Sequence, residues 1–442
     1  MALPGPRSPA AALRSAVGMQ RRPSEQLLTL HDTYGPVCEF GRGPLRFVLL
    51  FGADANRLIL ADRADAFLWG PALKLLEAVD GPTALVVSDG EEHKRRRRLV
   101  QPAFHARRIQ GYVDLMVSEV DRTLEGWTAG RELDAFVDLR RTIRRVVVRA
   151  LFGEDLREQA DEIGDVLEPA LDYVNQPLLR QQVKLDLPGT RWRRCKRARS
   201  GTDAIIDREI ARRRAAGIDG DQDRGDILAT LLSTRDEHDQ PGLSDEEIRD
   251  QVVSLVAAGY DTTSSAMAWA VRALVTDSSQ WAKAKAEVDE HLGGSLPTAE
   301  ALVGLRHLDG VVNETLRLWP PGLVSGRESM VDVEFAGYNI PARSTVLYSP
   351  WVTHRMPELW PAPDAFRPER WDDDPVPYSY VPFGGGVRRC IGFLFATLEM
   401  KVALARMLQR VELVALPADS TPTGIAALRP AGGVPVRILA QN

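Results

Sequence analysis

The segment FGGGVRRCIG, residues 383–392, precedes an apolar stretch with helical periodicity that continues to Leu408. Its three consecutive glycines have no Cβ atoms, so the loop can lie flat against a large planar ligand. Cys390 would then stand at the N-terminus of the following helix, where free backbone N–H groups and the positive end of the helix dipole favour a thiolate. A thiolate is the form in which cysteine binds a metal such as iron. Arg388 could neutralise a carboxylate of the same ligand.

Two other interpretations of this segment remain open at this point. Cys390 could be a small core residue that follows a flexible turn. A glycine-rich loop can also bind phosphate, but no Gly-Lys-Ser/Thr follows the glycines here.

The composition indicates an ordinary folded protein. The chain has 442 residues, of which 44% are hydrophobic and 26% charged, and its formal net charge of −5 gives no reason to expect nucleic acid as a partner. The three cysteines, Cys38, Cys195 and Cys390, are too few and too widely spaced for a disulfide framework, so we expect reduced thiols in the cytoplasm. Prolines interrupt the N-terminus, and no apolar run reaches the roughly 18 residues of a membrane span.

Short β-like segments stand near both ends of the chain, with a helical region between them. The segments 36–40 and 46–51 flank Gly41-Arg42-Gly43 and predict a hairpin. Further β-like segments lie at 331–335, 338–340, 345–349, 411–416 and 434–439. We predict a single domain over residues 1–442, with a helix-rich core at about 90–320 and β-containing segments at about 36–60 and 331–442. Such a pattern favours an α+β unit whose termini pair in a common sheet.

Two helices inside this region have well-marked ends. The first opens at Ser244, with Glu247 three residues later as in a capping box, and could run to about Thr276. That is far longer than the usual globular helix. The second spans roughly residues 305–319 and must stop before Pro320-Pro321, because proline restricts its predecessor and cannot donate a hydrogen bond.

Polar residues interrupt the first helix at Ala258-Gly259-Tyr260-Asp261-Thr262-Thr263. A glycine in mid-helix costs roughly 1 kcal/mol and invites an explanation. A threonine hydroxyl can bond a carbonyl one turn back and loosen the helix there, which would open room for a small molecule. The alternative is a polar stripe that faces solvent.

The second helix carries Glu314 and Arg317 one turn apart on the same side. Taken alone, this pair is best explained as an exposed helix pair that contributes about 0.2–0.5 kcal/mol.

Together, these segments resemble the cytochrome P450 family. Residues 383–392 are similar to the cysteine-ligand loop F-x-x-G-x-R-x-C-x-G, and Ala396 matches the small residue usual on the following helix. Residues 258–263 resemble the oxygen-activation motif A-G-x-D/E-T-T. Residues 314–317 and 368–371 resemble the E-x-x-R and P-E-R-F/W segments. Their order and spacing argue against a chance match.

The resemblance covers nearly the whole chain and implies the mainly α (α+β) cytochrome P450 fold, with a large helical region and small β-sheets around a buried haem. It implies haem b, iron protoporphyrin IX, with Cys390 as the metal ligand and Phe383 packed beside the sulfur. It also implies a buried network of Glu314, Arg317 and Arg370 behind the loop. His93 stands where many members have Trp. The residues implied to bind the haem are His93, Arg97, Ala258, Arg327, His354, Phe383, Arg388, Cys390, Ile391 and Gly392.

The implied activity is that of a monooxygenase that hydroxylates or epoxidises an apolar small molecule, such as a lipid, steroid, terpenoid or polyketide. Thiolate donation to iron supports O–O cleavage, and Asp261 and Thr262 would relay protons to bound dioxygen. A separate ferredoxin with its reductase would supply electrons derived from NAD(P)H, and the basic run Arg95–Arg98 would face this acidic donor. The pocket would be lined by parts of 67–85, 167–187, 323–324 and 421–425.

Two other functions stay open from the sequence. The same haem could serve an enzyme that uses peroxide or rearranges an oxygenated substrate, although the intact Asp261-Thr262 pair argues against it. A haem-thiolate sensor or carrier without turnover is the non-enzymatic alternative. Substrate-stimulated, NADPH-driven O₂ consumption would separate these functions.

Overall fold

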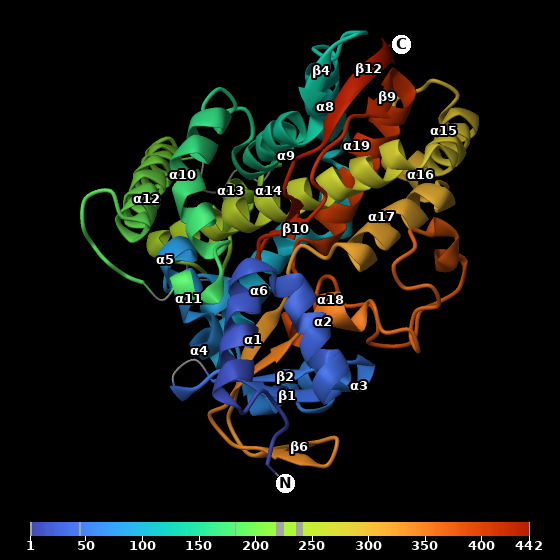
Figure 1. The fold of residues 1–442 in the computed structure, drawn as a ribbon. Helices are drawn as coiled ribbons and strands as arrows, with labels where there is room; N and C mark the ends of the chain where they lie inside the picture. The colour runs from blue at the N-terminus through green and yellow to red at the C-terminus, as the bar shows by residue number, and fades with distance from the viewer. Residues whose placement is uncertain (1, 44–45, 182, 218–224, 236–241, 442) are drawn as a thin grey trace.

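A computed structural model describes residues 2–43, 46–181, 183–217, 225–235 and 242–441, and shows a largely helical molecule with small sheets at its two ends (Figure 1). The long helices are α1 (Pro9–Arg21), α2 (Pro23–Tyr34), α6 (Gly90–Val100), α8 (Val113–Leu124), α9 (Ala135–Phe152), α10 (Ala160–Val174), α12 (Arg191–Ala215), α14 (Asp245–Thr276), α15 (Ser278–Leu292), α17 (Arg306–Leu318) and α19 (Phe393–Arg410). The short helices are α3 (Ala53–Arg57), α4 (Gly70–Leu73), α5 (Glu77–Asp80), α7 (Ala106–Gln110), α11 (Leu178–Gln181), α13 (Ile227–Leu232), α16 (Ala299–Val303) and α18 (Pro350–Thr353). Within these described ranges, no helix is long and apolar enough to cross a membrane.

Helix α14 is the central element, and it crosses the middle of the molecule in Figure 1. It has 32 residues, and its capping box forms as predicted: the Ser244 hydroxyl accepts from the Glu247 N–H, and the Glu247 carboxylate accepts from the Ser244 N–H. It packs most extensively against α9 and also contacts α12, α17 and α19. The predicted second helix is α17, which ends at Leu318, just before the two prolines.

The predicted N-terminal hairpin is confirmed. Strands β1 (Val37–Phe40) and β2 (Phe47–Leu50) pair antiparallel, and β2 runs parallel to β8 (Thr345–Tyr348). The sheet has the order β1-β2-β8-β5-β3, with β5 at Ser325–Ser329 and β3 at Phe67–Leu68. The remaining strands are β4 (Glu132–Asp134), β6 (Val333–Phe335), β7 (Tyr338–Ile340), β9 (Val411–Ala415), β10 (Pro422–Thr423), β11 (Arg429–Pro430) and β12 (Pro435–Gln441).

The prediction that strands from both ends of the chain pair in a common sheet holds for β8 but is wrong for the C-terminal strand β12. The last long strand, β12, pairs with β4 and β9 in a separate sheet, while β5 and β8 join the N-terminal hairpin. The reason is the length of α19, whose 18 residues span about 27 Å at 1.5 Å per residue. This helix carries the chain away from the first sheet, so the N- and C-termini lie at opposite ends of the molecule (Figure 1).

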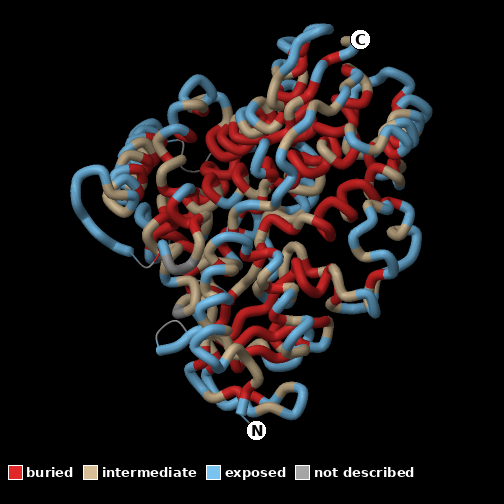
Figure 2. Tube along the Cα trace, in the orientation of Figure 1, coloured by how far each residue is buried: buried red, intermediate tan, exposed pale blue. Residues whose placement is uncertain are grey.

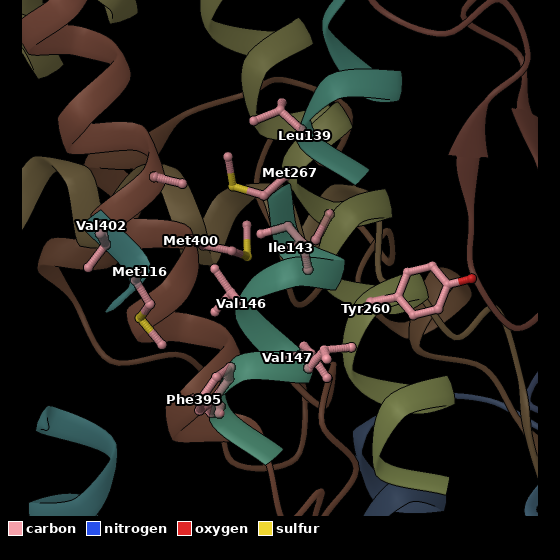
Figure 3. Close-up of a cluster of buried hydrophobic side chains, with 14 of the residues drawn as sticks. Met116, Leu139, Ile143, Val146, Val147, Tyr260, Met267, Phe395, Met400 and Val402 are labelled. Atoms are coloured by element: carbon pink, nitrogen blue, oxygen red, sulfur yellow. The ribbon is translucent and has the colours of Figure 1, made fainter. Parts of the chain in front are cut away.

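The largest hydrophobic core lies between the long helices, where buried residues concentrate in Figure 2. Side chains of α8, α9, α14 and α19 converge there, and Figure 3 shows Met116, Ile143, Met267 and Met400 among them. Full burial of an apolar side chain of this size contributes about 1.5–3 kcal/mol to the stability of the fold. This core fixes α19 relative to α14, and therefore fixes the loop before α19 relative to the polar interruption in α14.

Candidate active site

A mainly apolar cavity of about 560 Å³ lies between α14 and the loop 383–392. Its size is that of a typical small-molecule site. Most of the site residues predicted from sequence line this cavity, although they come from distant parts of the chain. They are His93, Arg97, Ala258, Thr262, Phe383, Arg388, Cys390, Ile391 and Gly392. Three others, Asp261, Arg327 and His354, are not among its lining residues.

The loop before α19 presents the Cys390 sulfur to the cavity. Cys390 is exposed there, whereas Cys38 and Cys195 are buried in the protein. Gly386 has a φ of +59°, and a Cβ at this position would lie 2.0 Å from the Leu60 carbonyl oxygen, so this turn requires glycine. The Cys390 N–H donates to the Phe383 carbonyl at 2.9 Å and closes the loop.

Cys390 lies slightly farther from the start of the following helix than the prediction drawn from the helix dipole assumed. Helix α19 begins at Phe393, so Cys390 lies outside its first turn. Burial raises the pKa of the Cys390 thiol, and this effect outweighs the Gly392 N–H and the Arg97 guanidinium, which lower it. A metal bound to the sulfur would therefore have to displace the proton, as metals do when thiols coordinate them.

The donor set at Cys390 fits a metal that brings most of its own ligands. Among the residues that the structure describes, no group of three or more His, Cys, Asp or Glu side chains could hold a metal ion. Cys390 alone would leave a bare ion poorly coordinated. A haem iron brings nitrogen ligands of its own, and Cys390 would supply the further ligand that it takes from the protein.

On the other side of the cavity, α14 presents its polar interruption. Ala258 is exposed to the cavity, and the Thr262 hydroxyl donates to the Ala258 carbonyl at 2.6 Å. This is the bond one turn back that the sequence predicted. Thr262 and Cys390 therefore line the same cavity from different elements.

Asp261 faces away from this cavity, into a buried ion-pair chain that the sequence did not reveal. Its carboxylate accepts from Arg140 Nη2 at 3.1 Å, and Arg140 Nη1 donates to Glu168 at 2.5 Å. Burial raises the pKa of Asp261, and the Arg140 guanidinium opposes this shift. Glu168 lines a second, outer cavity of about 640 Å³, so the chain of charges connects α14 with the surface.

One edge of the inner cavity is rich in cationic groups. Arg388 forms an ion pair with Asp89 and donates to the Ser88 carbonyl at 2.6 Å. The guanidinium of Arg327 stacks 4.0 Å from the centre of the Trp69 ring, and that of Arg388 lies 5.3 Å from the same ring. Asp89 and Trp69 were missed from sequence, because a single Asp or Trp in a loop carries no recognisable spacing.

This edge fits a ligand with carboxylate groups. Burial, together with the guanidiniums of Arg327 and Arg97, lowers the pKa of Arg388 to about 10 despite the ion pair with Asp89, and a carboxylate beside Arg388 would oppose this shift. The Trp69 Nε1 is buried and has no acceptor among the described residues, and a donor left in this way is costly. A haem carboxylate would stabilise both.

His93 and Arg97 lie on α6 at the same edge. Burial and the guanidiniums of Arg388 and Arg97 lower the pKa of His93 to about 3, so its ring is neutral. Arg97 donates to the Arg389 carbonyl at 2.8 Å and thereby joins α6 to the cysteine loop.

The prediction that His354 contacts the haem is corrected by the structure. His354 is fully buried, and both ring nitrogens bind backbone groups: Nδ1 lies 3.0 Å from the Arg317 carbonyl oxygen, and Nε2 accepts from the Val381 N–H at 3.0 Å. The ring therefore bridges α17 and the segment that leads into the cysteine loop. No donor remains for a carboxylate.

The predicted network behind the loop is confirmed, and an exposed helix pair is excluded. Glu314 and Arg317 are both fully buried and joined at 2.8 Å, and Arg370 Nε donates to Glu314 at 2.9 Å. Arg317 also donates to the carbonyls of His354 and Pro363, each at 2.7 Å. The network thus fastens α17 to the irregular segment that precedes the loop.

The basic run on α6 was predicted to face an acidic electron donor, but two of its arginines point into the protein. Arg95 and Arg96 are partly buried and pair with Glu247 at the start of α14, so they fasten α6 to the central helix. Lys94 and Arg98 are exposed. A partner could therefore meet only part of the run.

Comparisons with known proteins agree with this geometry. A model of the family "Cytochrome P450" matches residues 4–428. "Putative cytochrome P450 139" of Mycobacterium tuberculosis (strain ATCC 25618 / H37Rv) is 44% identical over 94% of this chain and 97% of its own length. "Cyclooctat-9-en-7-ol 5-monooxygenase" of Streptomyces melanosporofaciens is 33% identical over 92% of this chain and 88% of its own length. The solved structure of retinoic-acid-bound cyanobacterial CYP120A1 matches with a TM-score of 0.86 and 28% identity, over 97% of this chain and 96% of that one. The chain therefore belongs to the cytochrome P450 family and is a haem-dependent monooxygenase.

Proposed function

We propose that this protein oxidises an apolar terpenoid with one polar end, with electrons from a separate ferredoxin and its reductase. The observation that carries the proposal is the common cavity of Cys390 and Thr262, whose other walls are mainly aliphatic and aromatic side chains. Burial of apolar substrate surface against such walls contributes about 25 cal/mol per Å² to the free energy of binding.

The haem would be held by Cys390 as the iron ligand, with Phe383, Ile391 and Gly392 beside its ring on the same side. Arg97, Arg388 and Arg327 would neutralise its carboxylates, with His93 and the indole N–H of Trp69 as neutral partners. Haem bound through a thiolate supplies the electron donation that favours O–O cleavage.

Thr262 and Asp261 would manage protons. The Thr262 hydroxyl can release the Ala258 carbonyl and hold a water molecule in the loosened turn of α14. The Asp261 carboxyl, whose pKa burial raises, can carry a proton when it leaves Arg140. Glu168 at the outer cavity would resupply that proton from solvent. A positioned proton donor of this kind typically accelerates a proton-transfer step by about 10²–10⁴-fold.

The walls of the cavity and the relatives support the proposed substrate class. Cyclooctat-9-en-7-ol and retinoic acid are both largely hydrocarbon terpenoids that carry an oxygenated group. Each appears in the name of a protein that is similar to this chain over most of its length. The inner cavity offers few polar groups away from its cationic edge. We therefore place the substrate's hydrocarbon body against α14 and the 425–426 turn.

The test is a reconstituted reaction under ¹⁸O₂ with NADPH, an acidic ferredoxin and its reductase, using retinoic acid and a cyclic terpene alcohol as probes. We expect one ¹⁸O atom in the product and NADPH use that rises with the probe. A product that carries oxygen from water, or O₂ uptake indifferent to every terpenoid probe, would refute the proposed function.

Ligation is tested separately on the same protein. Reduced protein exposed to CO should show the strongly red-shifted Soret band of thiolate-bound haem, and Cys390→Ser should lose this band. Cys195→Ala is the matched control, because Cys195 is buried away from the cavity. Loss of the band in the control alone would refute the ligand assignment.

A further inference from the structure

A short turn at residues 424–427 separates the inner cavity from the outer one. Ile425 and Ala426 line the inner cavity, while Thr423 and Gly424 line the outer cavity. The turn joins β10 to β11, and no other strand of the described residues pairs with these two. Whatever holds this turn therefore sets the wall between the two spaces.

One side chain from a distant helix holds the tip of the turn. Asn175, the C-cap of α10, accepts at Oδ1 from three successive backbone N–H groups: Ile425 at 2.8 Å, Ala426 at 3.0 Å and Ala427 at 3.1 Å. Its Nδ2 donates to the Ala427 carbonyl at 3.2 Å. The amide thus satisfies four polar groups of a segment that has no sheet partner at its tip.

The turn is shaped to receive this amide. Gly424 has a φ of +100°, and a Cβ there would lie 2.8 Å from Asn175 Oδ1. The base of the turn has separate supports: Trp269 Nε1 donates to the Leu428 carbonyl at 2.8 Å, and the Leu323 N–H donates to the Ile425 carbonyl at 2.9 Å. Among the described residues, Asn175 alone bonds to the Ala426 backbone through its side chain.

We propose that Asn175 is a positioning residue that fixes the turn as the end wall of the substrate cavity and thereby limits the length of substrate admitted. This inference rests on the proposed function, because it assumes that the substrate lies in the inner cavity. Without the amide, the tip of the turn loses four hydrogen bonds, and the inner cavity opens toward the arginine-lined outer cavity.

The experiment measures binding of two iron-binding probes to the haem-loaded protein, 4-phenylimidazole as the short one and 1-dodecylimidazole as the long one. In Asn175→Ala we expect unchanged affinity for the short probe and about tenfold tighter binding of the long probe. A tenfold gain corresponds to burial of about two further methylene groups. Asn339→Ala is the matched control, because Asn339 is an exposed amide on β7 that binds Asp332.

Asn175→Asp provides the rescue. Its carboxyl keeps an oxygen for the same three N–H groups, and when protonated it can also donate to the Ala427 carbonyl. Because the protonated and the ionised carboxyl both accept from these three N–H groups, the preference of this variant should stay close to that of wild type as the pH changes. An unchanged ratio of the two affinities in Asn175→Ala would overturn the proposal. Equal weakening of both probes with a lower Tm would also overturn it, because that is the signature of general destabilisation. Failure of the proposed function would appear elsewhere, in the ¹⁸O₂ experiment.

Discussion

Thr262 and Asp261 are neighbours in the chain, but α14 directs their side chains to different surroundings. Thr262 lines the cavity, and Asp261 pairs with Arg140 on the other side of the helix. A helix rotates about 100° per residue, so the side chains of neighbouring residues can point to different surroundings. The pair therefore suits transfer of a proton through the helix wall rather than joint contact with a substrate.

We predict that Thr262→Ala uncouples the reaction. Haem content and electron uptake should stay close to wild type, while the ratio of product to NADPH oxidised falls by about 10²-fold or more and hydrogen peroxide is released. The control is Thr276→Ala, since Thr276 makes the same bond one turn back, to the Arg272 carbonyl at 2.7 Å, at the far end of α14. A wild-type ratio in Thr262→Ala would remove Thr262 from the proton path.

Trp69 gives a second prediction for a single residue. Trp69→Phe keeps an aromatic ring beneath Arg327 and Arg388 but removes the Nε1–H that lacks an acceptor. We expect haem to transfer to apomyoglobin roughly tenfold faster, because one hydrogen bond to a charged group contributes about 1.5–3 kcal/mol. Reconstitution with haem dimethyl ester should abolish most of this difference. Equal rates with natural haem would show that the indole does not reach a carboxylate.

Among the elements, α17 bonds to the segment that leads into the loop before α19. The fully buried Glu314 carboxylate accepts from Arg317, from Arg370 and from the Arg367 N–H at 2.9 Å. Such a network supports the folded state when every partner is present, and loss of one partner strongly destabilises the protein. It thus fixes the irregular segment 361–371, which has little regular structure of its own.

We predict that Glu314→Ala yields little haem-loaded protein, because two buried guanidiniums lose their carboxylate at a cost of about 3–5 kcal/mol. Glu369→Ala should behave like wild type. Glu369 lies in the same segment, but its bond to Lys283 is at the surface. The measurement is haem per polypeptide together with the CO spectrum. Normal haem content in Glu314→Ala would mean that the network does not support the loop.

The elements also show what the sequence could and could not predict. The ends of α14 and α17 depend on residues within one turn, the Ser244 capping box and Pro320, so local pattern sufficed. The strands that pair with β12 depend on where α19 ends in space, and the sequence of a strand does not specify which strand it will pair with. Arg140, Trp69 and Asp89 were missed for the same reason, because each reaches the site only through long-range packing.

At the scale of the whole molecule, net charge opposes the proposed electron donor. The chain carries a formal charge of −5, and an acidic ferredoxin would be repelled on average. A docking face must therefore be locally basic and close to Cys390. Helix α6 meets the second condition through the bond from Arg97 to the Arg389 carbonyl, and its exposed Lys94 and Arg98, with the exposed Arg389 of the loop, meet the first.

We predict that Arg98→Glu slows reduction of the haem by an acidic ferredoxin by about tenfold at low salt, and that the slope of rate against ionic strength becomes flatter. Both effects follow from the loss of steering between opposite charges, which salt screens within about 10 Å at 0.1 M. Arg95 and Arg96 are unsuitable for this test, because their reversal would break the pairs with Glu247 that fasten α6 to α14. The control is Arg14→Glu, which makes the same change in net charge at an exposed position on α1. Equal slowing in both variants would show that only the overall charge matters, and the docking face would then lie away from α6.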